Sequence, residues 1–226
     1  VIYGVTDQKK FDALSRVNTF LHVNNSAEAS RLGVLLCING TGILNSWLRR
    51  ITGSGTLSYN EMNELASKVK IGADGISVLP FGNGSERMLG NRDAGAVISG
   101  LNFNTHSAGS IYRAAQEGIA FSFRYGLDIM RETGMSPTRI KAGMANMFLS
   151  NVFRETLAGI TGAEIDLYNT DGSAGAARGA GIGCEYYRNS GEAFAGLKIV
   201  GKTEPSIRRN EYEEAYLRWK ELLDKN

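Results

Sequence analysis

Apolar residues in this chain recur at every second position or form short unbroken runs, and both patterns are typical of β-strands. The run at residues 33–39 is continuously apolar, which indicates a strand that is buried on both faces. On these patterns we predict strands over residues 1–6, 19–25, 33–39, 75–81, 95–101, 138–144 and 164–169.

Other segments carry apolar residues three or four positions apart, which is the spacing of an amphipathic helix. The longest, residues 107–134, opens on Ser107 and closes on Gly134, as helices commonly do. Ser58 and Glu61 form a capping-box pattern at the start of another. We predict helices over residues 43–52, 58–70, 107–134, 150–162 and 210–226. The order strand–helix–strand–helix in the second half indicates parallel pairing in a layered α/β domain, without internal repeats or linkers.

Composition narrows the functional classes. The chain has 226 residues and a net charge of +2, which argues against general affinity for nucleic acid or for a membrane surface. No apolar run has the roughly 18 residues of a membrane span, and no signal-peptide pattern opens the chain. Cys37 and Cys184 have no paired spacing, so we expect a reduced, cytoplasmic setting. His22 and His106 lie far apart, which disfavours a metal site or a serine–histidine triad.

Small residues gather at three strand-to-helix joints, residues 39–47, 140–150 and 168–178. Ligands of open α/β sheets bind beside such joints, where unhindered backbone N–H groups can meet phosphates. Three such joints converging on one cleft suggest a nucleotide-sized ligand, whereas each joint alone is equally explained by tight packing. The sequence contains neither a P-loop nor a dinucleotide-binding fingerprint. The thin segment DGSAGAARGAG, residues 171–181, raises the same two alternatives.

Taken in order, these motifs resemble the C-terminal half of the FGGY carbohydrate kinases. A strand, a small-residue turn, ANMFL, a helix ending in TG, a strand and then DGSAGAARGA follow one another as in that family. VLPFGNGSERMLGN is similar to the FLPYxSGERTPH of xylulokinases, and QEGIAFSFRYGLD to their LEGVAFAxRDGLE. The resemblance covers nearly the whole chain, and the GSER loop favours a xylulokinase over a glycerol kinase.

The resemblance implies a set of ATP-binding residues. The adenosine-motif glycines of the family fall on Lys141 and Ala142, followed by Gly143, and its adenine-side Asn falls on Asn146. A second nucleotide contact region falls on three residues of the helix at 43–52 and the turn before it, namely Gly42, Asn45 and Ser46, where Ser46 replaces a Gln and Asn45 is a substitute for it. The thin segment would correspond to a family helix that packs beside the adenosine turn, and the resemblance implies that this helix is thin because the turn and the sheet crowd it.

The implied fold is the actin-like ATPase, or ribonuclease H-like, α/β fold, with a mixed, mostly parallel sheet and helices on both faces. Residues 1–226 would be the C-terminal domain of a two-domain sugar kinase. Because Val1 begins within a strand pattern, we expect a fragment whose N-terminal sugar-binding domain, with the catalytic Asp, lies outside this chain. No catalytic or metal-binding residue is therefore assigned here. Four carboxylates are candidates for a polar role, and the Glu86 loop is the strongest candidate to face a cleft or partner: Glu86, Glu117, Asp128 and Asp171.

The implied activity is transfer of the ATP γ-phosphate to a sugar hydroxyl, most simply of D-xylulose, with ATP and Mg²⁺ as cofactors. A kinase for ribulose, gluconate or glycerol, and a non-catalytic nucleotide-binding protein of the same fold, are the alternatives. The expected partners are ATP or ADP, a sugar and the N-terminal domain, with no nucleic acid or membrane. We expect the fragment alone to be inactive and, through an exposed apolar face, to favour self-association, for example as a homodimer.

Overall fold

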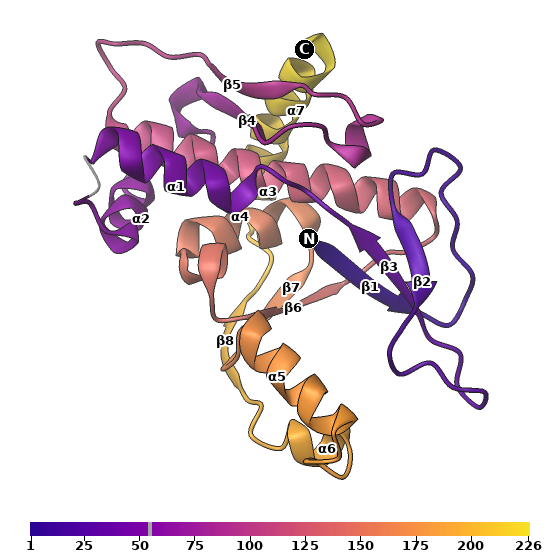
Figure 1. The fold of residues 1–226 in the computed structure, drawn as a ribbon. Coiled ribbons are helices and arrows are strands. Elements are labelled where there is room, and N and C mark those ends of the chain that lie inside the picture. Colours follow the sequence, from indigo (N-terminus) through magenta and orange to yellow (C-terminus); the bar gives the residue numbers. More distant parts are fainter. Residues whose placement is uncertain (54–55) are drawn as a thin grey trace.

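A computed structural model describes residues 1–53 and 56–226 (Figure 1). The strands are β1 (Ile2–Thr6), β2 (Asn18–Leu21), β3 (Leu32–Leu36), β4 (Ser77–Phe81), β5 (Gly95–Ser99), β6 (Arg139–Gly143), β7 (Glu164–Tyr168) and β8 (Ile199–Thr203). The α-helices are α1 (Thr41–Thr52), α2 (Tyr59–Ser67), α3 (Ala108–Glu132), α4 (Asn151–Thr161), α5 (Gly172–Gly183), α6 (Ser190–Ala193) and α7 (Arg209–Lys225). Short 3₁₀ turns lie at Ala73–Gly75, Arg87–Leu89 and Asn146–Leu149.

The mixed α/β content was predicted, but the expectation of a mostly parallel sheet is wrong for the strands that the structure describes. They form sheets of order β1-β3-β2, β4-β5 and β6-β7-β8. Among these strands β6 and β7 pair in parallel, and every other pairing is antiparallel. The reason lies in the connections. Helix α4 links β6 to β7 and provides the crossover that parallel strands need, whereas β2 with β3 and β4 with β5 are joined by loops.

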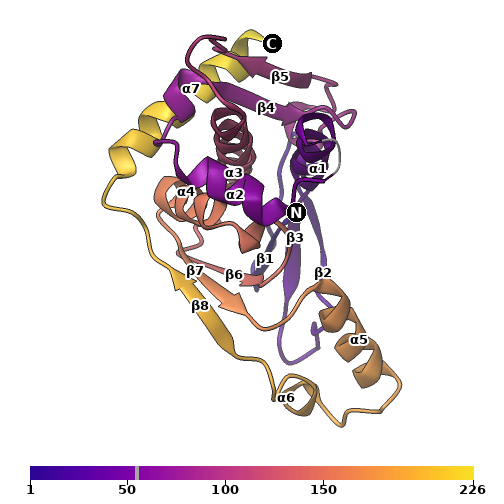
Figure 2. The same ribbon diagram turned by 90° about the vertical axis from the view of Figure 1, so that its left-hand side faces the viewer.

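Helix α3 runs through the middle of the molecule, with β4 and β5 on one side and α4 on another (Figures 1 and 2). Helix α3 packs closely against β4 because Gly118 faces that strand. A Cβ atom at residue 118 would lie 2.1 Å from the carbonyl oxygen of Val78. Ala114, Ala115 and Ala120 keep the rest of the helix narrow and are buried. Two apolar clusters, one toward α2 and α4 and one toward α7, both reach Phe123 of α3.

The C-terminal helix α7 covers one side of the second cluster (Figure 2). Trp219 is fully buried, and its indole N–H donates to the carbonyl oxygen of Val78 at 2.8 Å. Its ring stacks on Tyr216 and meets Phe121 edge-on. These contacts explain why the amphipathic pattern at residues 210–226 forms a packed helix.

Helices α5 and α6 form an arm that projects from the body of the molecule (Figures 1 and 2). None of the residues of α5 is buried, and a Cβ atom added at Gly175 or Gly179 would meet nothing within 4 Å. The expectation that this helix is thin because the adenosine turn and the sheet crowd it is therefore wrong for the described chain. Its small residues leave an open surface along most of its length.

No helix in the described ranges, residues 1–53 and 56–226, is long and apolar enough to cross a membrane.

Candidate nucleotide site

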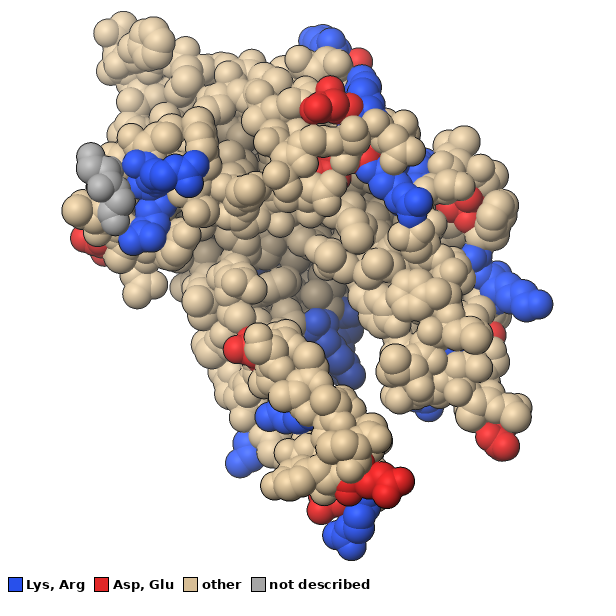
Figure 3. All heavy atoms as spheres, viewed as in Figure 1, with Lys and Arg blue, Asp and Glu red and all other residues tan. Residues whose placement is uncertain are grey.

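A cavity of about 850 Å³ opens between β1 and β6, and the turn that follows β6 lines part of it. Figure 3 shows the hollow between the body of the molecule and the α5–α6 arm, with Lys or Arg side chains inside it. Three of the residues predicted for ATP binding border this cavity, namely Ala142, Gly143 and Asn146. Asp171 and Gly172, at the start of α5, border it as well. Two of the three small-residue joints identified in the sequence therefore meet.

Gly143 is the point of contact between these two joints. A Cβ atom at this position would lie 2.5 Å from the carbonyl oxygen of Thr170 and 3.3 Å from the Cα atom of Asp171. Because both neighbours are backbone atoms, a larger residue would force the two chain segments apart. The N–H of Met144 donates to the carbonyl oxygen of Tyr168 at 2.9 Å and extends the pairing of β6 with β7 into the turn.

Asn146 occupies a special backbone position. Its φ angle is +53°, in the left-handed region that Asn tolerates better than other residues with a Cβ atom. The residue begins the 3₁₀ turn Asn146–Leu149 and is exposed. Its side-chain amide makes no hydrogen bond within the described chain, so both its donor and its acceptor groups are available to a ligand.

The start of α5 offers backbone donors beside the same turn. Asp171 caps the helix by accepting a 2.8 Å hydrogen bond from the N–H of Ala174. The guanidinium of Arg178 donates to the hydroxyl of Thr170 at 2.9 Å, which fixes the residue that faces Gly143. A helix start without large side chains lets an anion approach its N–H groups.

The other predicted contact region lies on α1 and does not line this cavity. Gly42 is exposed, and a Cβ atom added there would have nothing within 4 Å, whereas Ser46 is half-buried. Asn45 is 8% exposed, and its side-chain oxygen has no hydrogen-bond partner in the described residues. The third small-residue joint instead packs inward, since a Cβ atom at Gly40 would collide with the carbonyl group of Pro80.

Glu86 lies inside the protein and does not face a cleft, contrary to the expectation for its loop. Its side chain is fully buried, and its Oε1 atom accepts a 2.8 Å hydrogen bond from the N–H of Asn39. Burial raises the pKa of this carboxyl group, partly offset by the hydrogen bonds from the backbone at Asn39 and Gly40. Glu86 thus ties the loop after β4 to the turn before α1.

The carboxylates of Glu117, Asp128 and Asp171 each bind another group of the protein. That of Asp171 accepts the hydrogen bond from the N–H of Ala174. Glu117 is buried, pairs with the Nε atom of Arg113 at 2.6 Å and accepts from the N–H of Gly72 at 3.1 Å. Burial raises the pKa of Glu117, and the Arg113 guanidinium opposes that rise. Asp128 pairs with Arg124 and Arg131 on the surface of α3.

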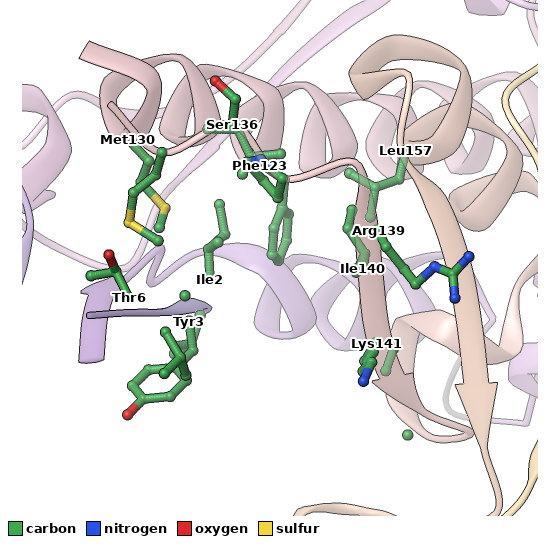
Figure 4. Close-up of a pocket in the computed structure, with 18 of the residues that line it drawn as sticks. Ile2, Tyr3, Thr6, Phe123, Met130, Ser136, Arg139, Ile140, Lys141 and Leu157 are labelled. Carbon is green, nitrogen blue, oxygen red and sulfur yellow. The ribbon is translucent and has the colours of Figure 1, made fainter. Parts of the chain in front are cut away.

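The resemblance gives no reason for a lysine at residue 141, where the family has a glycine. Figure 4 shows its side chain on β6, directed away from the apolar floor of the cavity. The contact of Gly143 with the backbone of Thr170 is a second feature without a sequence signal. Thr170 is 27 positions along the chain, and the contact depends on the parallel pairing of β6 with β7.

No group of three or more His, Cys, Asp or Glu side chains is placed to hold a metal ion in the part of the chain that the structure describes. These residues therefore do not fit a metal site by themselves.

Comparison with known proteins places this geometry in a family. The model of the FGGY family of carbohydrate kinases, C-terminal domain, matches residues 3–184. The chain is 28% identical over 192 residues to the xylulose kinase of Haemophilus influenzae, covering 82% of this chain and 38% of that protein. It is 29% identical over 189 residues to the glycerol kinase of Paenarthrobacter aurescens, covering 82% of this chain and 37% of that protein.

Solved structures give the same result for the fold. The xylulose kinase of Rhodospirillum rubrum superposes with a TM-score of 0.80 at 22% identity, over 99% of this chain and 44% of that one. The glycerol kinase of Plasmodium falciparum, solved with ADP, superposes with a TM-score of 0.77 at 19% identity, over 99% of this chain and 45% of that one. The fold is thus that of the actin-like sugar kinases, as the resemblance implied.

The chain belongs to the FGGY family of carbohydrate kinases and corresponds to the C-terminal domain of that family. It spans about two fifths of the length of the curated relatives that it matches.

Proposed function

We propose that this chain forms the nucleotide-binding part of an ATP-dependent carbohydrate kinase. The observation that carries the proposal is the meeting of the turn 142–146 with the start of α5, in a chain of this family. Ala142 and Gly143 keep the approach narrow, and the free amide of Asn146 is suited to the polar edge of a purine or ribose. The relative solved with ADP supports a nucleotide as the ligand.

Gly42, Asn45 and Ser46 are proposed as a second nucleotide contact region. Gly42 is open to solvent and Ser46 is half-buried, so both can be reached by a ligand without rearrangement of α1. Asn45 is buried, and it would have to act through its neighbours or turn outward.

The complete polypeptide is proposed to transfer the ATP γ-phosphate to a hydroxyl group of D-xylulose. The substrate follows from relatives and structural neighbours that are named xylulose kinases. Mg²⁺ is proposed as the companion of ATP, because phosphoryl transfer depends on neutralising charge on the phosphates. We assign the Asp that accepts the sugar proton, together with the sugar site, to an N-terminal domain. That domain is the proposed partner of residues 1–226. The proposed location of the complete polypeptide is the cytoplasm. The isolated chain is proposed to be inactive.

Two alternatives lead to different outcomes. Relatives named glycerol kinase and ribulokinase, and a gluconate kinase among the structural neighbours, favour testing those sugars and polyols as well. A nucleotide-binding protein without transfer activity is the second alternative.

The test is release of ADP from MgATP by the full-length polypeptide, with D-xylulose, ribulose, gluconate and glycerol supplied one at a time. The proposal predicts the highest kcat/KM with D-xylulose. A higher value with another substrate would reassign the sugar and leave the nucleotide role intact. ATP binding without ADP release on any of them would favour the non-catalytic alternative, and absence of both would contradict the proposal.

A further inference from the structure

Lys141 is a cation at the border of the cavity whose charge is not used within the protein. Among the described residues, three Lys or Arg side chains border the cavity, namely Lys10, Arg139 and Lys141. Lys10 donates a hydrogen bond to the side chain of Gln8, and Arg139 pairs with Glu164 at 3.1 Å. Lys141 is exposed and makes no hydrogen bond or ion pair in the part of the chain that the structure describes. Its ammonium group is therefore available to a ligand in the cavity.

The carboxylates on the same face of the sheet already lie beside other cations. Glu164 pairs with Arg139 at 3.1 Å and with Lys202 at 3.0 Å. Asp166 of β7 is the register partner of Lys141, and its side chain is only 1% exposed. Arg139 and Lys202 also lie 3.5 and 3.8 Å from the carboxylate of Asp166. Two positive and two negative charges thus compensate one another, and the charge of Lys141 is left over.

Lys141 lies on the same face of β6 as Gly143. Successive residues of a strand alternate between its two faces, so residues 141 and 143 share one. A Cβ atom at Gly143 would point at the backbone of Thr170 and Asp171, which lead into α5. Lys141 is therefore on the face at which α5 begins, about 7 Å along the strand from Gly143. Figure 4 agrees with this placement, since it shows the Lys141 side chain directed away from the apolar floor of the cavity.

The start of α5 leaves two backbone donors free beside this face. The carboxylate of Asp171 caps the N–H of Ala174, whereas the N–H groups of Gly172 and Ser173 form no hydrogen bond within the described chain. Gly172 borders the cavity, and a Cβ atom there would meet nothing within 4 Å. An anion can therefore approach these N–H groups, and Lys141 supplies the positive charge that offsets the nearby carboxylate of Asp171.

We propose that Lys141, together with the free N–H groups at the start of α5, binds a phosphate group of the nucleotide and makes the site selective for nucleotides over nucleosides. The assignment depends on the proposed function, in which Asn146 meets the purine or ribose. Because the family has a glycine at this position, the contact is a property of this chain. A lysine ammonium is a compact charge on a flexible stem, which suits phosphate binding without a fixed bidentate geometry.

The test is calorimetric titration of the full-length polypeptide with ADP and with adenosine. We expect Lys141→Met to weaken ADP binding about tenfold and to change adenosine affinity less than about twofold, because only ADP carries phosphates. Lys141→Arg keeps the charge and should keep most of the ADP affinity. The difference between the parent and Lys141→Met should shrink as the salt concentration rises. Lys220→Met, at an exposed position of α7 outside the cavity, is the matched control and should bind both ligands as the parent does.

Three other results would overturn the role of Lys141. Equal ADP affinity of the parent and Lys141→Met would exclude the phosphate contact and leave the proposed function standing. Equal losses for ADP and adenosine would assign Lys141 a structural role in the sheet, for example beside Asp166. Absence of ADP binding by the folded parent would overturn the proposed function, and the role of Lys141 with it.

Discussion

Gly143 faces the carbonyl oxygen of Thr170 so closely that a Cβ atom at residue 143 would lie 2.5 Å from it. This approach brings the turn after β6 against the start of α5. A side chain at Gly143 would therefore disturb the two segments that are proposed to hold the nucleotide, whereas a side chain added on the open face of α5 would not.

The first prediction compares Gly143→Val with Gly175→Ala. We expect Gly143→Val to weaken ADP binding at least tenfold and to destabilise the protein by about 1–3 kcal/mol, because backbone atoms must move. Gly175→Ala, on the open face of α5, should leave ADP affinity unchanged and stabilise the helix by up to about 1 kcal/mol. Calorimetric titration and thermal unfolding measure the two effects. Equal ADP affinity in both variants would separate Gly143 from nucleotide binding.

The second prediction separates the backbone of Asn146 from its amide. Asn146→Gly keeps the left-handed backbone and removes the side chain, whereas Asn146→Ala strains the same position by about 1 kcal/mol. We expect both variants to lose ADP affinity to a similar extent, with only the Ala variant less stable to urea. If affinity follows stability and the Gly variant binds normally, the amide has no part in recognition.

The third prediction concerns pH and Glu86. Burial raises the pKa of this carboxyl group, so the folded protein binds the proton more readily than the unfolded chain. The stabilisation that results is fully present below the unfolded pKa of about 4.3 and is lost as pH rises through the folded pKa.

Glu86→Gln should therefore remove a component of stability that declines with rising pH. We expect the free energy of unfolding of the parent, relative to the Gln variant, to fall as the pH rises from about 4.3 toward neutral. Urea unfolding at several pH values measures it, with the exposed Glu204→Gln as the matched control. A difference between parent and Glu86→Gln that stays constant over this range would contradict the account.

The fourth prediction tests the buried pair of Arg113 and Glu117, which are 6% and 2% exposed in their side chains. Glu117→Gln leaves the Arg113 guanidinium buried without its counter-charge and should cost about 3–5 kcal/mol. Replacing both, as Arg113→Met with Glu117→Leu, should cost less than the single change, although the N–H of Gly72 then loses its acceptor. Equilibrium urea unfolding of the three proteins measures this, and a double variant less stable than Glu117→Gln would refute it.

Most helices and strands could be predicted because their patterns are local. Ser58 and Glu61 form the capping box that their spacing indicates, and α3 begins and ends within two residues of the expected bounds. Strand β8 could not be predicted because Ile199–Thr203 is short and mostly exposed, so no apolar alternation marks it. The short helix α6 likewise lacks a periodic pattern.

Pairing and close approach could not be predicted from local patterns. The order of strands and helices suggested mostly parallel pairing, yet β4 and β5 form an antiparallel pair because the loop that connects them contains no α-helix. The glycines of α5 suggested crowding, but Gly175 and Gly179 face open space, whereas Gly143 is confined by Thr170, which is distant in sequence.

The candidate site is predictable only in part. Gly143 and Asn146, which the resemblance singles out, border one cavity in the folded chain. Their contacts with a nucleotide stay predictions, as do those of Gly42, Asn45 and Ser46 on α1. The meeting of the two segments depends on the pairing of β6 with β7, which a local pattern does not encode.

The most direct test of the nucleotide-binding account is to map, by NMR chemical shifts or hydrogen exchange, which backbone amides of the full-length polypeptide respond to ADP. The account predicts the largest responses at residues 142–146 and 172–174, with smaller ones at residues 42–46 of α1. A saturable response to ADP that leaves the turn after β6 and the start of α5 unchanged would contradict it.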